Sequence, residues 1–202
     1  MIERKLDHDP VVSSAAWHHD RPAPMHLEDA AHRHRILSTA TAVVALVDVV
    51  GAVTVVDLGA GDGGLLSLLP GHLPDGVAAY GYDFTPANLV AAAGRGVDVR
   101  DGDLVDLVAA GLDLAGPTVI VLGEVIEHLR NPHRLIAELA ATPHVAGVVA
   151  SSPWTETTGD AYEGHLWAWD AEGYEHLFTT AGFRTLAVDL VGMFTIYTGA
   201  IT

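Results

Sequence analysis

Residues 124–128 place three ionisable side chains within five positions, directly after an apolar run at residues 118–122. The stretch reads Glu124-Val-Ile-Glu127-His128. If this turn is helical, the two carboxylates and the imidazole lie on one face, at positions i, i+3 and i+4. Such groups can bind a divalent metal ion, and each can also transfer a proton. The alternative is a structural role, in which Glu127 or His128 bonds the backbone beside a ligand.

A glycine-rich loop is the second chemical signal. The sequence runs from Asp57 through Gly59, Gly61 and Gly63 directly after a short β-prone run. Glycine lets the backbone approach a ligand closely, and the start of a following helix offers free N–H groups. Asp83 stands 20 residues after Gly63, where a carboxylate can accept hydrogen bonds from ribose hydroxyls. The pattern predicts a ligand with an adenosine-like part.

The glycine spacing alone does not choose between cofactors, because it also fits the dinucleotide-binding pattern. Two carboxylates flank or enter the loop, Asp57 and Asp62. They would repel a pyrophosphate but suit a cation. A sulfonium that carries an amino-acid tail therefore fits better than a dinucleotide.

These residues resemble the class I S-adenosylmethionine-dependent methyltransferases, whose first motif reads acidic-x-Gly-x-Gly-x-Gly. The resemblance covers about residues 50–200, and Asp101-Gly-Asp103-Leu104 is similar to the motif that contacts adenine in that family. The alternative for this acidic pair is that it only caps a helix. The resemblance implies an S-adenosylmethionine site formed by Asp57, Gly59, Ala60, Gly61, Asp83, Phe84, Asp103, Leu104 and Glu124.

Catalytic groups are expected at the same end of the sheet. We predict that His128, His165 or Glu124 accepts the proton of the methyl acceptor. The set Glu-x-x-Glu-His with a later His also resembles the small-RNA 3′-terminal 2′-O-methyltransferases, which use it to hold a metal ion. That resemblance implies a metal set of Glu124, Glu127, His128 and His165, although the acidity of the chain counts against an RNA substrate.

The elements that must position these residues alternate between strand and helix. The expected fold is α/β, a single doubly wound, mostly parallel seven-stranded sheet of the Rossmann-like kind with a C-terminal antiparallel hairpin. Residues 1–50 are expected to form an arm and a helix that cap the active site, and residues 51–202 the methyltransferase domain. The predicted strands are 54–58, 77–82, 97–100, 118–122, 145–151, 184–190 and 193–198, and the predicted helices 26–50, 65–69, 86–93, 104–110, 133–141 and 171–181.

Composition limits the remaining choices. The 202 residues include 26 Asp or Glu against 10 Lys or Arg, a formal charge of −16, which disfavours nucleic-acid and membrane partners. There is no Cys, so disulfides and thiolate metal sites are excluded. Neither a signal sequence nor a membrane span is predicted, and we expect a cytoplasmic monomer or homodimer. Six of the 12 His fall in the first 34 residues, and this segment is expected to be an arm of uncertain role.

The sequence therefore predicts an S-adenosylmethionine-dependent methyltransferase that acts on an oxygen or nitrogen of a small molecule. Three alternatives remain: a metal-dependent enzyme of the RNA 2′-O-methyltransferase kind, a non-catalytic S-adenosylmethionine-binding module of a larger assembly, and, least favoured, an NAD-dependent oxidoreductase.

Overall fold

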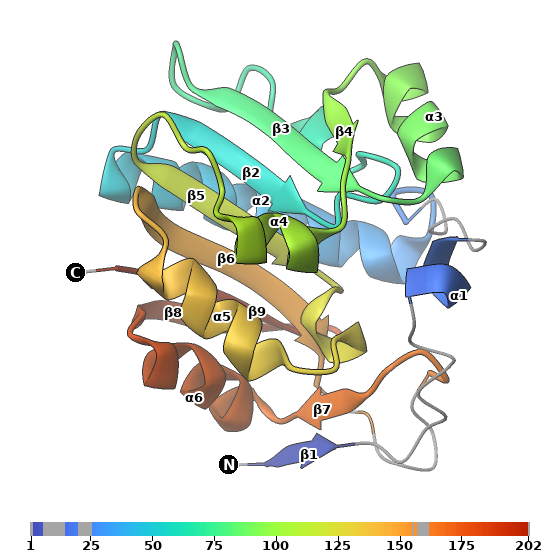
Figure 1. The fold of residues 1–202 in the computed structure, drawn as a ribbon, viewed down its shortest axis with the longest axis vertical. Helices are drawn as coiled ribbons and strands as arrows, with labels where there is room; N and C mark the ends of the chain where they lie inside the picture. The colour runs from blue at the N-terminus through green and yellow to red at the C-terminus, as the bar shows by residue number, and fades with distance from the viewer. Residues whose placement is uncertain (1, 6–14, 20–25, 155, 157–161, 202) are drawn as a thin grey trace.

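The computed structural model describes residues 2–5, 15–19, 26–154, 156 and 162–201. Its centre is a seven-stranded sheet with the order β4-β3-β2-β5-β6-β9-β8 (Figure 1). The first five strands in this order are parallel, and β9 runs antiparallel to both β6 and β8. The strands are β2 (Thr54–Leu58), β3 (Ala78–Asp83), β4 (Val99–Asp101), β5 (Thr118–Gly123), β6 (Val145–Pro153), β8 (Arg184–Val191) and β9 (Phe194–Ala200). This confirms the predicted fold class.

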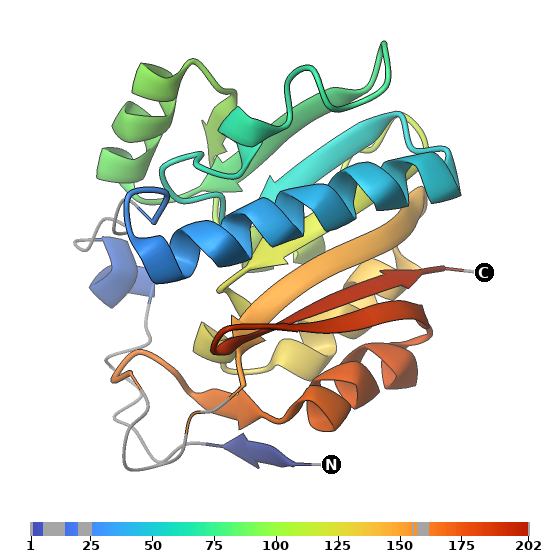
Figure 2. The ribbon, with the colours of Figure 1, turned by 180° about the vertical axis from the view of Figure 1, so that it is seen from behind.

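Helices cover both faces of the sheet. The long helix α2 (Ala30–Val50) crosses one face, as Figure 2 shows, and Figure 1 shows α4 (Leu104–Ala110), α5 (Pro132–Ala141) and α6 (Ala171–Ala181) on the other. The helix α3 (Pro86–Arg95) lies at the β4 end. No helix of the described residues is long and apolar enough to cross a membrane.

The two central strands are apolar because they are covered on both sides. All five residues of β2 are buried, and so are the first five of β5. Val55 packs in one core cluster with Val43 of α2, whereas Val56 packs in the other with Ile136 of α5. Because β2 and β5 are parallel neighbours, their carboxyl ends meet at one edge. The glycine loop and residues 124–128 are thereby placed side by side.

The segment after the glycine loop departs from the prediction. A helix was expected at residues 65–69, but the structure has only the 3-10 turn η1 (Leu66–Leu68). Pro70 has no N–H with which to continue a helix, and Gly71 adopts a left-handed φ of 80°. The loop therefore does not lead into a helix N-terminus.

The N-terminal residues form more structure than the expected arm. The strand β1 (Glu3–Lys5) pairs antiparallel with β7 (Trp167–Trp169), and α1 (Ala15–His19) is a short helix. Neither β1 nor β7 was predicted, because the two strands form only by pairing with each other across segments far apart in the chain. Residues 6–14 and 20–25 of the predicted arm, His8 among them, lie outside the described residues.

Candidate active site

A pocket of about 1060 Å³ opens at the carboxyl ends of the parallel strands. Its lining includes all nine residues predicted for the cofactor and all three predicted proton acceptors, namely Asp57, Gly59, Ala60, Gly61, Asp83, Phe84, Asp103, Leu104, Glu124, His128 and His165. The volume is at the upper end for small-molecule sites and exceeds what one compact ligand fills. A cofactor and a small acceptor can therefore share it.

The backbone amides of the glycine loop are used within the protein. Gly59 and Ala60 both donate to the carbonyl of Tyr82, and Gly63 donates to that of Ala60. The amide of Gly61 donates to Asp83 at 2.9 Å. With no helix N-terminus behind it, this loop offers little to a pyrophosphate. The loop geometry therefore counts against a dinucleotide, because it offers few free N–H groups to a pyrophosphate. The glycine spacing alone did not show this.

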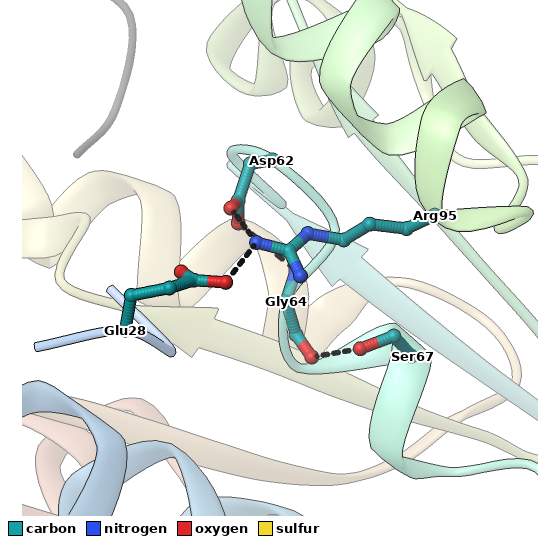
Figure 3. Close-up of polar contacts among 5 residues, drawn as sticks. All are labelled: Glu28, Asp62, Gly64, Ser67 and Arg95. Carbon is teal, nitrogen blue, oxygen red and sulfur yellow. Dashed lines mark hydrogen bonds and ion pairs between the residues drawn. The ribbon is translucent and has the colours of Figure 1, made fainter. Parts of the chain in front are cut away.

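The loop itself is held by an ion-pair cluster. Arg95 of α3 pairs with Asp62 in the loop and, at 3.4 Å, with Glu28 just before α2 (Figure 3). The amide of Gly64 also donates to Asp62, and the hydroxyl of Ser67 donates to the Gly64 carbonyl (Figure 3). Asp62 was predicted to attract a cationic ligand. The structure instead shows its carboxylate neutralised by Arg95.

Two further carboxylates hold local structure as well as lining the pocket. Asp83 accepts hydrogen bonds from the amide of Thr85 at 2.8 Å and the side chain of Asn88 at 3.1 Å. Asp103 accepts from the amide of Val105 and is the N-cap of α4. Asp103 therefore does cap a helix, and capping does not exclude contact with a ligand.

Buried groups of opposite charge lie near the glycine loop. One of them, Arg35, was not predicted from the sequence as a site residue. Arg35 of α2 is 3% exposed, and its Nε lies 3.9 Å from an Oε of Glu124. Burial raises the pKa of Asp57 to about 7, an effect that the charge of Arg35 opposes and that of Asp83 reinforces. The sequence signal for Arg35 was available, because a charged residue stood on the apolar stripe of a predicted helix.

Glu124 has an unusual backbone. It is the first residue after β5 and has a φ of 60°, in the left-handed region that non-glycine residues rarely adopt. Strain of this kind concentrates at functional sites. Burial raises the pKa of Glu124 to about 7, and the charges of Arg35 and His165 lower it again in part.

The four predicted metal ligands do not all come together. One ligand atom each from Glu127, His128 and His165 lies within 4.8 Å of the others, whereas Glu124 does not belong to this group and instead faces Arg35. His165 pairs through Nδ1 with Glu156 at 2.6 Å. The turn η2 (Ile126–His128) is a single 3-10 turn, so the helical face expected for the first two carboxylates does not form.

Other histidines gather at the same end of the pocket. His18, His26 and His32 of the N-terminal segment also line it. The capping role expected for residues 1–50 stays a prediction. The rings of His26 and His32 stack at 4.1 Å, and burial lowers the pKa of His26 to about 4. Burial also lowers the pKa of His32, so both stacked imidazoles favour the neutral form at this end of the pocket.

The aromatic residues near position 160 divide between pocket and core. Tyr162 lines the pocket and is half exposed. Trp169 is 2% exposed and packs edge to face on Tyr174. The indole of Trp154 donates to the Gly192 carbonyl. Of these three rings, only that of Tyr162 lines the pocket.

Comparison with known protein families gives the decisive observation. A profile described as a methyltransferase domain matches residues 17–188, most of the chain. The chain belongs to this family. The resemblance read from Asp57 to Gly63 is thereby confirmed, and the protein is a methyltransferase of the class I type. A search of curated proteins finds no match.

Solved structures share the fold of this methyltransferase at low sequence identity. The N-methyltransferase NodS from Bradyrhizobium japonicum WM9, solved with S-adenosylhomocysteine, has a TM-score of 0.65 at 16% identity, with 88% of this chain and 91% of that chain covered. The O-methyltransferase NcsB1, solved with S-adenosylmethionine and 2-hydroxy-5-methyl naphthoic acid, has a TM-score of 0.61 at 21% identity, covering 96% of this chain and 59% of that one. The N-terminal domain of EvdMO1, solved with S-adenosylhomocysteine and D-fucose, has a TM-score of 0.56 at 18% identity and coverages of 81% and 83%. At these identities the likeness shows the fold alone.

Proposed function

We propose that this methyltransferase transfers the methyl group of S-adenosylmethionine to an oxygen or nitrogen of a small-molecule acceptor. The observation that carries the proposal is that one pocket of about 1060 Å³ is lined both by the glycine loop and by several histidines. The structural neighbours are consistent with it, because they include an N-methyltransferase and an O-methyltransferase solved with the methyl donor or its product. The acidic chain favours a small acceptor over RNA.

Charge complementarity suggests how the cofactor binds. The methionine part of S-adenosylmethionine carries a carboxylate and an ammonium group, and the buried guanidinium of Arg35 beside the carboxyl of Asp57 matches this pair. We expect Asp83 at the end of β3 to accept hydrogen bonds from the ribose hydroxyls, and Asp103 at the start of α4 to accept one from the adenine amino group; both residues line the pocket.

For methyl transfer, the main task of the protein is to position the acceptor atom, the methyl carbon and the sulfur. The acceptor atom attacks the methyl carbon, the carbon–sulfur bond breaks, and its electron pair stays on the sulfur, which leaves neutral. Holding the three atoms in line contributes up to roughly 7–11 kcal/mol. Among the three predicted proton acceptors, Glu124 fits best, since its pKa of about 7 suits a base at neutral pH. Burial lowers the pKa of His128 to about 3, which makes its imidazole a weak base.

Thermal unfolding with single ligands tests the cofactor assignment. A ligand that binds the folded state raises the melting temperature, so S-adenosylhomocysteine is expected to stabilise the protein and NAD is not. Stabilisation by NAD alone would contradict the proposal. Arg35→Gln is expected to weaken S-adenosylhomocysteine binding at least tenfold, whereas the exposed Arg184→Gln on β8 leaves it unchanged.

Activity assays then separate the remaining functions. Methyl transfer to small hydroxyl or amine acceptors supports the proposal, and transfer to RNA 3′ ends alone would favour the RNA alternative. Binding of the cofactor with no turnover on either class would indicate the non-catalytic module. A cytoplasmic location and a monomeric or dimeric state remain predictions, which fractionation and light scattering can check.

A further inference from the structure

We propose that Glu127, His128 and His165 bind a divalent first-row transition-metal ion in the wall of the pocket. One potential ligand atom from each residue lies within 4.8 Å of the other two. His128 and His165 line the pocket, and their ring centroids are 4.6 Å apart. The group differs from the four-residue set expected from the sequence, since Glu124 does not belong to it and lies 3.9 Å from Arg35.

Hydrogen bonds fix which nitrogen of each histidine is available. Nδ1 of His128 lies 2.9 Å from the carbonyl of Gly164, and a carbonyl can only accept, so this nitrogen carries the proton. Nδ1 of His165 lies 2.6 Å from the carboxylate of Glu156, which likewise accepts when ionised. In each neutral ring the lone pair is then on Nε2. Metal-binding histidines are commonly oriented in this way, with the second nitrogen bonded to a carbonyl or carboxylate.

The side chain of Glu127 gives a second observation, which is independent of the distances between the ligand atoms. Its side chain is 0% exposed, and among the described residues neither carboxylate oxygen has a hydrogen-bond partner. A buried carboxylate without partners is costly unless a cation neutralises it or it stays protonated. The main chain of Glu127 is by contrast firmly placed, because its carbonyl accepts a 2.7 Å bond from the amide of Leu166. That bond also ties the His165 segment to η2.

The donor set indicates the class of ion. Two imidazole nitrogens and one carboxylate oxygen suit Zn²⁺, Co²⁺, Fe²⁺ or Mn²⁺, whereas Mg²⁺ and Ca²⁺ prefer oxygen ligands. Three protein ligands leave coordination positions open, and two of the three ligands face the pocket. An acceptor oxygen could occupy an open position, and this last point rests on the proposed function.

Titration of chelator-treated full-length protein with Co²⁺ tests the site, by calorimetry and by the visible absorption of bound Co²⁺. We expect one equivalent to bind, and Mg²⁺ not to compete. Glu127→Gln and His165→Ala should each weaken Co²⁺ binding at least tenfold, and Glu156→Gln, which only orients His165, about tenfold. The matched control His72→Ala removes an exposed imidazole that does not line the pocket, and this variant should bind Co²⁺ as the wild type does.

Two results would overturn the site: no binding of one Co²⁺ equivalent by the wild type, or unchanged affinity in both Glu127→Gln and His165→Ala. If circular dichroism shows that Glu127→Gln is unfolded, His165→Ala and Glu156→Gln decide. S-adenosylhomocysteine binding is measured on the same samples. Cofactor binding without Co²⁺ binding overturns only the metal site, and the reverse overturns only the proposed function.

Discussion

At the scale of single residues, the site is dominated by carboxyl groups removed from water. Burial raises the pKa values of Asp57 and Glu124 to about 7 and that of Glu127 well above its usual range. Such groups destabilise the folded state once they ionise, and function is the usual reason for keeping them. The sequence predicted that these acids gather here, but not that they are buried.

Asp57 gives a prediction with a definite sign. Its pKa in the folded protein, about 7, lies above the ~3.9 of an unfolded chain, so the folded state binds the proton more tightly. The stability that this proton provides is complete below pH ~4 and is lost as the pH rises to about 7. Asp57→Asn should therefore raise the free energy of unfolding at pH 8 by about 1–3 kcal/mol without ligand, while weakening S-adenosylhomocysteine binding at least tenfold. Chemical denaturation and calorimetry measure the two effects.

The matched control is Asp48→Asn, which changes an exposed aspartate of α2 in the same way. It should shift neither quantity by more than about 0.5 kcal/mol. Loss of stability at pH 8 in Asp57→Asn would show that the ionised carboxylate is satisfied in the folded state.

Gly59 tests how closely the loop packs. Gly59 and Gly71 have nearly the same left-handed φ, 82° and 80°. A Cβ at Gly59 would lie 2.6 Å from Cγ2 of Val125, whereas at Gly71 nothing lies within 4 Å. Gly71→Ala should cost about 1–2 kcal/mol for the backbone alone, and Gly59→Ala about 1–3 kcal/mol more and much of the cofactor affinity. Equal losses in denaturant unfolding would mean that the loop moves freely away from Val125.

At the scale of elements, the pocket depends on segments that meet across the ends of the strands. The glycine loop contacts α3 and the start of α2 through Arg95, and η2 is bonded to the segment before β7. Because only the 3-10 turn η1 follows the glycine loop, these cross-links replace the support that a crossover α-helix would give. Substitution of Arg95 therefore tests how much these contacts between elements contribute to the pocket.

Arg95→Gln should loosen both the loop and the segment before α2. We expect a loss of about 1–2 kcal/mol in unfolding free energy and a several-fold weaker affinity for S-adenosylhomocysteine, because Asp62 is largely buried and loses its cation. The control is again the exposed Arg184→Gln, with an expected change below about 0.5 kcal/mol. Equal cofactor affinity in both variants would restrict Arg95 to a role in stability.

At the scale of the whole molecule, residues near the N-terminus pack against a segment that lies far along the chain. The carbonyl of Ile2 accepts from the amide of Asp170, and Glu3 contacts both the indole of Trp169 and the imidazole of His133. Gly173 at the start of α6 is what permits this approach, since a Cβ there would overlap the carbonyl oxygen of Ile2.

The effect of Gly173→Ala on stability should therefore have opposite signs in chains with and without residues 1–5. In the full chain it should lower the melting temperature, because the added methyl group displaces β1 from β7. In a chain that lacks residues 1–5 it should raise stability by about 0.5–1 kcal/mol, as Gly→Ala does inside a helix. Thermal unfolding followed by tryptophan fluorescence measures both. The same sign in both chains would show that the N-terminus does not pack on α6.

The sequence by itself determined the sheet and the cofactor loop, because both depend on local patterns. Apolar runs separated by helical periods predicted α4 and α6 to the residue, and Asp57 through Gly63 indicated the cofactor. Only the tertiary structure decided which charges meet. Asp62 pairs with Arg95, Glu124 faces Arg35, and Glu127 joins two histidines. Such pairings depend on distances between segments far apart in the chain, and neither periodicity nor spacing along one segment contains them.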